Sequence, residues 1–186
     1  MQVELKTRKK ILKVTTVLFS QLPYNKVTIR NIAENAGVSP SLVLYYFVSK
    51  EDLYCQIFEE FLLSLEGKLI QLKSKAEVCL VDVVNCYIEL WRYNKSLLIL
   101  MHRELLSIGE SKVKQRLEFR FVQKHSELLK MTLLNLGLCK LAYQEYYCTL
   151  VMSLSIHPFI QGHSQPSSIG YDIDILKDVY HHALGC

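Results

Sequence analysis

The chain has 186 residues, of which 50% are hydrophobic, and a formal net charge of +4. This length suits one or two domains, and the hydrophobic share is enough for a sizeable core. Residues 1–13 are polar and basic, and the most apolar stretch, residues 146–156, is shorter than the roughly 20 residues of a membrane-spanning helix. We therefore expect a cytoplasmic protein without a signal peptide and without contact with a membrane.

The first predicted element is an amphipathic helix that ends before Pro23. Apolar residues recur along it at helical spacing. They are Ile11, Thr15, Leu18, Phe19 and Leu22.

Residues 28–47 predict two short helices joined by a tight turn. The apolar face of the first helix consists of Ile29, Ile32, Ala33 and Ala36. Thr28 can cap the start of this helix, and Gly37 stands where a left-handed residue is needed at its end. Ser39 suits the N-cap of the second helix, and Pro40 suits its first position, where no backbone N–H is required.

The second of these helices has an inner and an outer side. Val43 and Phe47 lie one turn apart and are expected to pack on the first helix. The outer side consists of Ser41, Leu42, Tyr45 and Tyr46. A third helix is expected to start after Ser49, with Asp52 completing an approximate capping box and Lys50 in the first turn. This arrangement presents one helix to the major groove of DNA. A simple helical hairpin inside a bundle is the alternative.

The excess positive charge lies entirely at this end of the chain. Residues 1–53 contain eight bases and four acids, whereas the remainder contains equal numbers of both. Phosphate neutralisation would use such a charge distribution. The basic run from Lys6 to Lys10 also fits a solvated terminus, but Arg30 and Lys50 are more telling because helix starts favour anions.

Residues 6–55 resemble the DNA-binding domain of the TetR family of bacterial transcriptional regulators. The resemblance rests on Ile11, Phe19, Thr28, Ile32, Ala33, Ala36-Gly37-Val38-Ser39, Phe47, Ser49-Lys50-Glu51 and Leu53. It implies an all-α homodimer. Residues 1–53 would form a three-helix DNA-binding domain with a helix-turn-helix, and residues 54–186 a helical bundle for ligand binding and dimerisation.

The resemblance also implies roles for single residues. Phosphate contacts would come from Thr28, Arg30 and Lys50, and contacts of the turn and recognition helix from Ser39, Pro40, Ser41, Leu42, Tyr45 and Tyr46. The chain departs from the family at Ser41, where many members have Gly, and at Val43-Leu44, where they have Leu-Tyr. Leu44 lacks the usual tyrosine hydroxyl, for which Tyr45 or Tyr46 can substitute.

Helical spacing continues through the second half of the chain. Beyond the helix that runs to about residue 73, we expect helices at about 78–93, 95–108, 110–136, 140–156 and 172–184, with a loop at 157–170. In the helix over 110–136, the residues expected to face inward are Val113, Leu117, Phe121, Leu128 and Leu129. The helix over 140–156 is apolar nearly all round, which suits either a central core helix or a dimer interface. The family pattern favours an interface made with the last helix.

A ligand pocket is predicted from polar or amphipathic side chains within apolar helices. They are Tyr87, Trp91, His102, Arg103, Glu104, His125 and Tyr147. Arg103 could bind an anionic ligand or pair with an acid, and we favour the ion pair.

The six cysteines lack the CxxC spacing of a zinc site, so we expect no metal. They are Cys55, Cys79, Cys86, Cys139, Cys148 and Cys186. Reduced, buried thiols are the favoured interpretation, and a redox switch is the alternative.

These patterns favour a ligand-responsive regulator that binds double-stranded DNA, more specifically a repressor released from a palindromic operator by a small-molecule effector. A protein-interaction module that keeps the fold without binding DNA is the alternative. An enzyme is not expected, because no catalytic triad, phosphate loop, HExxH motif or cofactor-binding motif is present.

Overall fold

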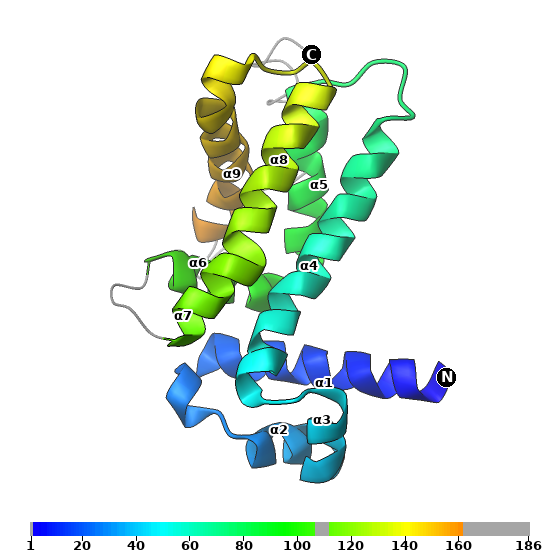
Figure 1. Ribbon diagram of the computed structural model, residues 1–186, viewed down its shortest axis with the longest axis vertical. Helices are drawn as coiled ribbons and strands as arrows, with labels where there is room; N and C mark the ends of the chain where they lie inside the picture. The colour runs from blue at the N-terminus through cyan, green and yellow to red at the C-terminus, as the bar shows by residue number, and fades with distance from the viewer. Residues whose placement is uncertain (1, 107–111, 162–186) are drawn as a thin grey trace. The chain divides into compact units, whose positions relative to one another are not determined.

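The computed structural model describes residues 2–106 and 112–161, which form helices joined by short connections and contain no strand (Figure 1). An all-α fold was predicted and is confirmed. The chain divides into two compact units. Unit 1 comprises Met1–Leu62 and Asn94–Val122, and unit 2 comprises Leu63–Tyr93 and Gln123–Cys186. The predicted domain boundary after residue 53 stays a prediction.

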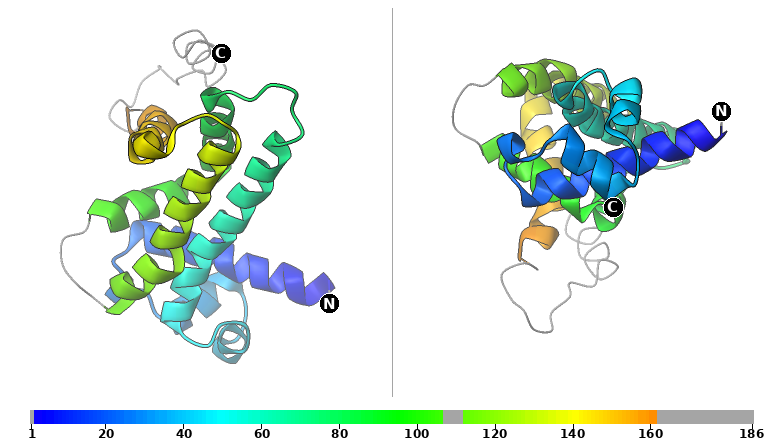
Figure 2. Two further views of the ribbon diagram at one scale, coloured as in Figure 1. Left: turned by 45° about the horizontal axis from the view of Figure 1, so that its top comes forward. Right: turned by 90° about the horizontal axis from the view of Figure 1, so that it is seen from below.

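Unit 1 contains the N-terminal helices and three segments from the middle of the chain. Its elements are α1 (Gln2–Gln21), η1 (Tyr24–Lys26), α2 (Ile29–Ala36), α3 (Pro40–Tyr46), the first part of α4 (Lys50–Leu72), α6 (Lys95–Leu106), α7 (Lys112–Leu117) and η2 (Glu118–Val122). Helix α1 packs against both α2 and α6, and α2 lies beside α3 (Figure 2).

The core of unit 1 is aromatic where α1 meets the start of α4. Phe19 and Tyr54 are buried and meet edge to face, with ring centroids 4.7 Å apart. The ring of Tyr24 stacks on Phe19 with a centroid distance of 5.6 Å, which anchors the connection between α1 and α2. Aromatic pairs of this kind stabilise a core beyond the area that they bury. These three rings hold together α1, the connection that leads to α2, and the start of α4.

Unit 2 is also a helical bundle. It comprises the rest of α4, α5 (Leu80–Tyr93), α8 (Gln123–Asn135), η3 (Leu141–Tyr143) and α9 (Gln144–Gln161). Helix α9 packs on α5 and on α8. Most residues of α5 are buried, including Tyr87 and Trp91 at 0% exposure, so α5 is the central helix of this unit.

The helix predicted over about 110–136 is present at 112–135, with a π-helical turn in it that the spacing did not predict. Helix α7 passes into η2, a π-helix over Glu118–Val122, before α8 begins at Gln123. A π-helical turn holds one more residue than an α-helical turn, so the inward face is shifted along the chain. Leu117, Phe121 and Leu129 are nevertheless buried as expected, whereas Val113 and Leu128 are only half-buried.

The predicted loop also starts too early. Helix α9 continues through Pro158 to Gln161, five residues beyond the expected end at 156. Proline removes one backbone donor, but the residues after it can still continue a helix. The predicted helix over 172–184 and Cys186 lie outside the described residues. Among the residues that the structure does describe, no helix is long and apolar enough to span a membrane.

Candidate nucleic-acid interface

Helix α2 begins at a complete capping box. The Thr28 hydroxyl accepts the backbone N–H of Asn31 at 3.1 Å, and the Asn31 side-chain oxygen accepts the backbone N–H of Thr28 at 3.2 Å. Two backbone donors that the helix cannot satisfy internally are thereby paired. The cap at Thr28 was predicted, whereas the part played by Asn31 was missed. Its position three residues after Thr28 was the signal that could have shown it.

The turn between the helices has the predicted geometry. Gly37 ends α2 in the left-handed region, with φ +62° and ψ +42°. The Ser39 hydroxyl accepts the backbone N–H of Leu42 at 3.2 Å, and Pro40 occupies the first position of α3. The side chain of Lys10 reaches this turn, where its ammonium lies 3.5 Å from the point at which a β-carbon on Gly37 would stand. A cation at this end of α2 is favourable toward the helix dipole.

Helix α3 is held on its inner side and open on its outer side. Val43 and Phe47 are fully buried, as are Ile32 and Ala36 of α2, so the two helices share one apolar interface. On the outer side, Ser41 is exposed and Tyr45 is 73% exposed.

Leu42 and Tyr46 were expected to face outward and be exposed, but both are half-buried. The ring of Tyr46 meets that of Tyr45 edge to face at 5.3 Å, and it also contacts Phe47. Tyr46 therefore supports Tyr45 from the side, and Tyr45 is the more exposed of the two residues.

The bases of the N-terminal segment divide into exposed and engaged groups. The exposed bases are Lys6, Lys9, Lys10, Lys13, Lys26 and Arg30. The side chain of Arg30 is 83% exposed and pairs with Glu34 one turn along α2 at 3.2 Å. An exposed pair of this kind is weak, and it leaves most of the guanidinium accessible to a phosphate.

Lys50 is partly committed to the fold. Its ammonium donates to the backbone carbonyls of Tyr24 and Val27, both at 3.0 Å, and lies 4.1 Å from the centre of the Tyr24 ring. Burial lowers the pKa of Lys50, and the neighbouring Glu51 acts in the opposite sense. An ammonium has three N–H donors, so one remains beyond the two carbonyls. The phosphate contact of Lys50 thus stays a prediction. Its hydrogen bonds to the two carbonyls give this residue a structural role as well.

Three of the predicted ligand residues lie on α6 of unit 1. The Arg103 guanidinium pairs with Glu104 at 3.5 Å and donates to the carbonyl of Leu22 at 3.2 Å. The favoured ion pair is therefore present. The Tyr54 hydroxyl lies beside the same pair, and burial together with Glu104 raises its pKa. His102 is half-buried on the same helix.

The other four lie in unit 2. The Tyr87 hydroxyl and His125 Nε2 share a hydrogen bond of 2.9 Å between α5 and α8, and the Trp91 ring lies 6.4 Å from that of Tyr87. Burial lowers the pKa of His125 to about 4, so this histidine is neutral near pH 7. Tyr147 is half-buried on α9. The role of all seven residues toward a ligand stays a prediction.

No disulfide joins two of the described cysteines. Burial, the largest effect on each, raises the pKa of Cys86 and of Cys148 to about 11. A reactive thiol needs a lowered pKa and an accessible position. In the described part of the chain, no three His, Cys, Asp or Glu side chains form a group that could hold a metal ion.

Comparison with known proteins finds a similarity over the segment that contains α2 and α3. Residues 11–57 match the family model described as bacterial regulatory proteins of the tetR family. The HTH-type transcriptional regulator RutR of Escherichia coli K12 is 42% identical over 55 residues. That match covers 30% of this chain and 26% of RutR, so the chain matches about a quarter of the length of its curated relative.

Solved structures show the same fold over nearly the whole chain. The fatty acid degradation regulator FadR from Bacillus halodurans superposes with a TM-score of 0.74 at 16% identity, covering 96% of this chain and 94% of FadR. FadR from Bacillus subtilis, solved in complex with stearoyl-CoA, gives 0.70 at 15% identity over 95% and 96% of the two chains. Residues 11–57 are thus similar to bacterial regulatory proteins of the tetR family.

Proposed function

We propose that this protein is a ligand-responsive DNA-binding transcriptional regulator, a repressor released from a palindromic operator by a small-molecule effector. One observation carries the proposal. Helix α3 exposes Ser41 and Tyr45 while Val43 and Phe47 fix it on α2, which is how a recognition helix is presented to a major groove. The proposal gives the chain a binding role and no reaction, and it places the protein in the cytoplasm, where bacterial DNA is.

Charge supports the DNA partner. The exposed bases of α1 and Arg30 at the start of α2 belong to the segment that holds the whole basic excess of the chain. Each phosphate neutralised by such a base releases a counterion, so binding should weaken steeply as salt is raised.

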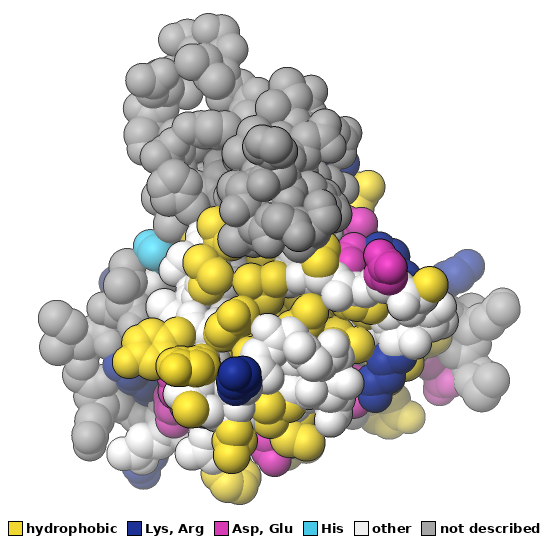
Figure 3. Space-filling model, turned by 90° about the horizontal axis from the view of Figure 1, so that it is seen from above, with side chains coloured by type: hydrophobic (Ala, Val, Ile, Leu, Met, Phe, Trp, Pro, Cys, Tyr) yellow, Lys and Arg dark blue, Asp and Glu magenta, His cyan; other side chains and the backbone are white. Residues whose placement is uncertain are grey.

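An exposed apolar surface supports a second copy of this chain as partner. Hydrophobic side chains gather over the face shown in Figure 3. In unit 2, large apolar side chains of α8, η3 and α9 are exposed, namely Met131, Leu141, Tyr143, Tyr146 and Leu150. Helix α9 thus has a buried side toward α5 and α8 and an apolar outer side, which suits an interface. A homodimer would set two α3 helices about 34 Å apart, one for each half of a palindrome.

The effector is proposed on the fold and on the buried polar groups. A regulator of this fold has been solved with stearoyl-CoA, which supports a small molecule as the signal for this chain too. To release DNA, the effector must bind the two conformations of the regulator with different affinities.

The first test is an unbiased selection of bound duplexes by the full chain. We expect one palindromic sequence to be enriched, with binding to it that falls steeply between 50 and about 200 mM salt. Equal, loose binding to every duplex would overturn the regulator proposal and favour an interaction module that kept the fold.

Matched variants test which surface binds. Arg30→Ala should weaken binding to all duplexes, and Tyr45→Ala should weaken binding to the selected duplex, each by about tenfold or 1–2 kcal/mol. Arg92→Ala and Tyr93→Ala remove an exposed arginine and tyrosine of α5 and should change nothing. Titration by fluorescence anisotropy measures all four. Equal effects at the α2–α3 and α5 positions would contradict the assignment of the surface.

A further inference from the structure

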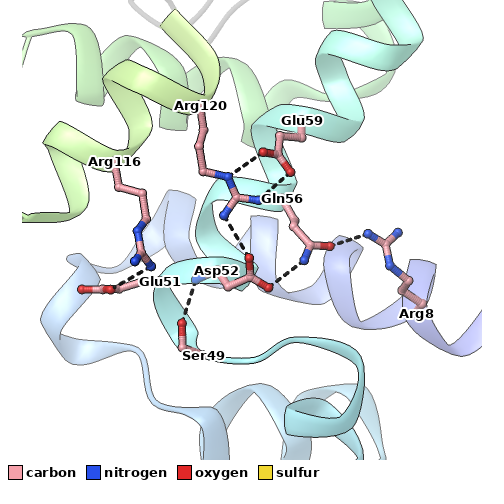
Figure 4. A network of polar contacts seen from close by, with 8 residues as sticks. All are labelled: Arg8, Ser49, Glu51, Asp52, Gln56, Glu59, Arg116 and Arg120. Carbon is pink, nitrogen blue, oxygen red and sulfur yellow. Dashed lines mark hydrogen bonds and ion pairs between the residues drawn. The ribbon is translucent and has the colours of Figure 1, made fainter.

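Arg120 lies in the π-helical turn of η2 and is held by two acids of α4 (Figure 4). Its guanidinium donates to both oxygens of Glu59, at 2.7 and 2.8 Å, and to Asp52 at 2.9 Å. All three side chains are less than 30% exposed. A bidentate, partly buried arginine fixes direction as well as distance, so it holds η2 firmly against the first three turns of α4. The π-helical geometry is itself uncommon and recurs at functional sites.

The polar contacts continue from Asp52 to the end of α3. The Gln56 amide donates to Asp52 at 2.7 Å, and Arg8 of α1 donates to the Gln56 oxygen and, at 2.5 Å, to Glu60. The Arg8 guanidinium also lies over the Phe47 ring, 5.4 Å from its centre. Phe47 is the C-cap residue of α3. An unbroken series of contacts within unit 1 therefore joins the π-helix to the end of the recognition helix. Figure 4 shows its steps from Arg120 to Arg8.

A neighbouring ion pair provides a natural comparison. Arg116, one turn before Arg120, contacts Glu51 of α4 at 3.2 Å through one nitrogen. Its side chain is 50% exposed and that of Glu51 is 37% exposed. Exposed pairs of this kind contribute little. Arg116 thus joins α7 to α4 weakly, whereas Arg120 joins η2 to α4 firmly.

The same π-helix forms a wall of a small cavity within unit 1. The cavity has a volume of about 80 Å³, and its lining includes Phe121 and Val122 of η2, Leu117 of α7, Met101 of α6 and Phe58 of α4. The Phe58 and Phe121 rings are 5.3 Å apart. Three charged residues, Glu104 of α6, Lys114 of α7 and Glu118 of η2, complete the lining. Three residues of the π-helix thus face the cavity, while Arg120, in the same turn, faces the acids of α4.

We propose that η2 couples this cavity to the recognition helix. A small, mostly apolar molecule in the cavity would displace the π-helical turn, and Arg120 would transmit the displacement through Asp52, Gln56 and Arg8 to Phe47 at the end of α3. Arg120 is a positioning residue in this scheme. The inference rests on the proposed function, because it assigns to the effector response a site and a route within unit 1.

A double-variant cycle tests the coupling without an effector. Leu117→Phe fills the cavity from α7, with Val122→Leu as a milder second variant, and Arg120→Gln breaks the contacts with Asp52 and Glu59. We expect each change to alter affinity for the selected duplex about fivefold or more. The combination should equal Arg120→Gln alone, since a signal that Arg120 transmits is lost with it.

Two further variants at the arginines act as controls. Arg116→Gln removes a cation from the same face and should change affinity less than about twofold. Arg120→Lys keeps the charge but loses the bidentate geometry, so its effect should lie between those of the wild type and Arg120→Gln. Simple additivity in the cycle, or equal effects of Arg116→Gln and Arg120→Gln, would overturn the coupling.

Hydrogen exchange separates this inference from the proposed function. Leu117→Phe and Arg120→Gln should each change the exchange rates of amides in α3, and Arg116→Gln should not. If the exchange responds but no duplex is specifically bound, the coupling stands and the DNA-binding proposal fails. If duplex binding is specific while α3 exchange is the same in all variants, the coupling fails and the DNA-binding proposal stands.

Discussion

The helix-turn-helix and the pair of helices α5 and α8 use polar side chains in opposite ways. In the first, Thr28 and Ser39 bond to backbone groups three residues away, and these contacts lie at the surface. In the second, Tyr87 and His125 are 38 residues apart and bond to one another in the interior of unit 2.

The difference determines which polar side chains stay accessible and which are buried in each region. Local caps complete α2 and α3 without using the outer side of α3, so Tyr45 stays accessible to a partner. The Tyr87–His125 pair satisfies two buried polar groups but is stable only while both are neutral. The first region should therefore tolerate changes on its outer side, and the second should respond to pH.

The largest effect on stability should come from removing a side chain on the inner side of α3, compared with one on its outer side. Phe47→Ala removes a fully buried ring that holds α3 on α2, and it should cost about 3–5 kcal/mol of unfolding free energy. Tyr45→Ala removes a ring that is 73% exposed and should cost no more than about 0.5 kcal/mol. Chemical unfolding followed by circular dichroism compares the two. A loss of similar size in both variants would mean that Tyr45 supports the fold, and the contrast between the sides of α3 would fail.

The next effect concerns acid and the buried pair. Burial lowers the pKa of His125 to about 4 in the native protein, whereas the pKa of this residue in the unfolded chain is about 6.5. Between pH 6.5 and pH 4, the unfolded chain therefore binds more protons than the native protein. Stability is therefore fully present above about pH 6.5 and should fall by about 3 kcal/mol as the pH drops to 4. The fluorescence of Trp91, whose ring contacts Tyr87, reports unfolding of unit 2.

Two histidine variants isolate the cause of that pH dependence. His125→Gln keeps a hydrogen-bonding group toward Tyr87 but cannot ionise, so it should lose most of the slope between pH 6.5 and 4. His102→Gln, on α6, should retain it. Identical pH profiles for the wild type and His125→Gln would show that carboxylates, and not this histidine, govern the acid response.

What the sequence could predict follows the same division. The caps at Thr28 and Ser39 and the left-handed Gly37 depend on residues three or fewer positions apart, and all three were predicted correctly. The inner side of α3 followed from the one-turn spacing of Val43 and Phe47. In each case the physical cause lies within one turn of the chain, where spacing alone reveals it.

The features that were missed depend on distant partners. Lys50 donates to the carbonyls of Tyr24 and Val27, which are 26 and 23 residues away. No local sequence pattern predicts these hydrogen bonds. The π-helix at η2 interrupts a stretch whose apolar spacing still suits a plain α-helix, and Arg120 finds Asp52 and Glu59 more than 60 residues earlier. His125 and Tyr87 were both singled out as polar residues in apolar helices, but spacing could not pair them.

The smallest effect concerns two glycines with opposite roles. Gly37 has φ +62°, a conformation that costs an L-residue about 1 kcal/mol, so Gly37→Ala should destabilise the protein by about that amount. The nearest atom to the added β-carbon would be Lys10 Nζ at 3.5 Å, an ordinary contact, so the backbone and not a clash is the cause. Gly67 lies inside α4 with open space around it, and Gly67→Ala should stabilise by about 0.5–1 kcal/mol. Chemical unfolding measures both. If Gly37→Ala also stabilised, the turn would adapt to an alanine, and α3 would depend less on its local caps than the comparison with α5 and α8 requires.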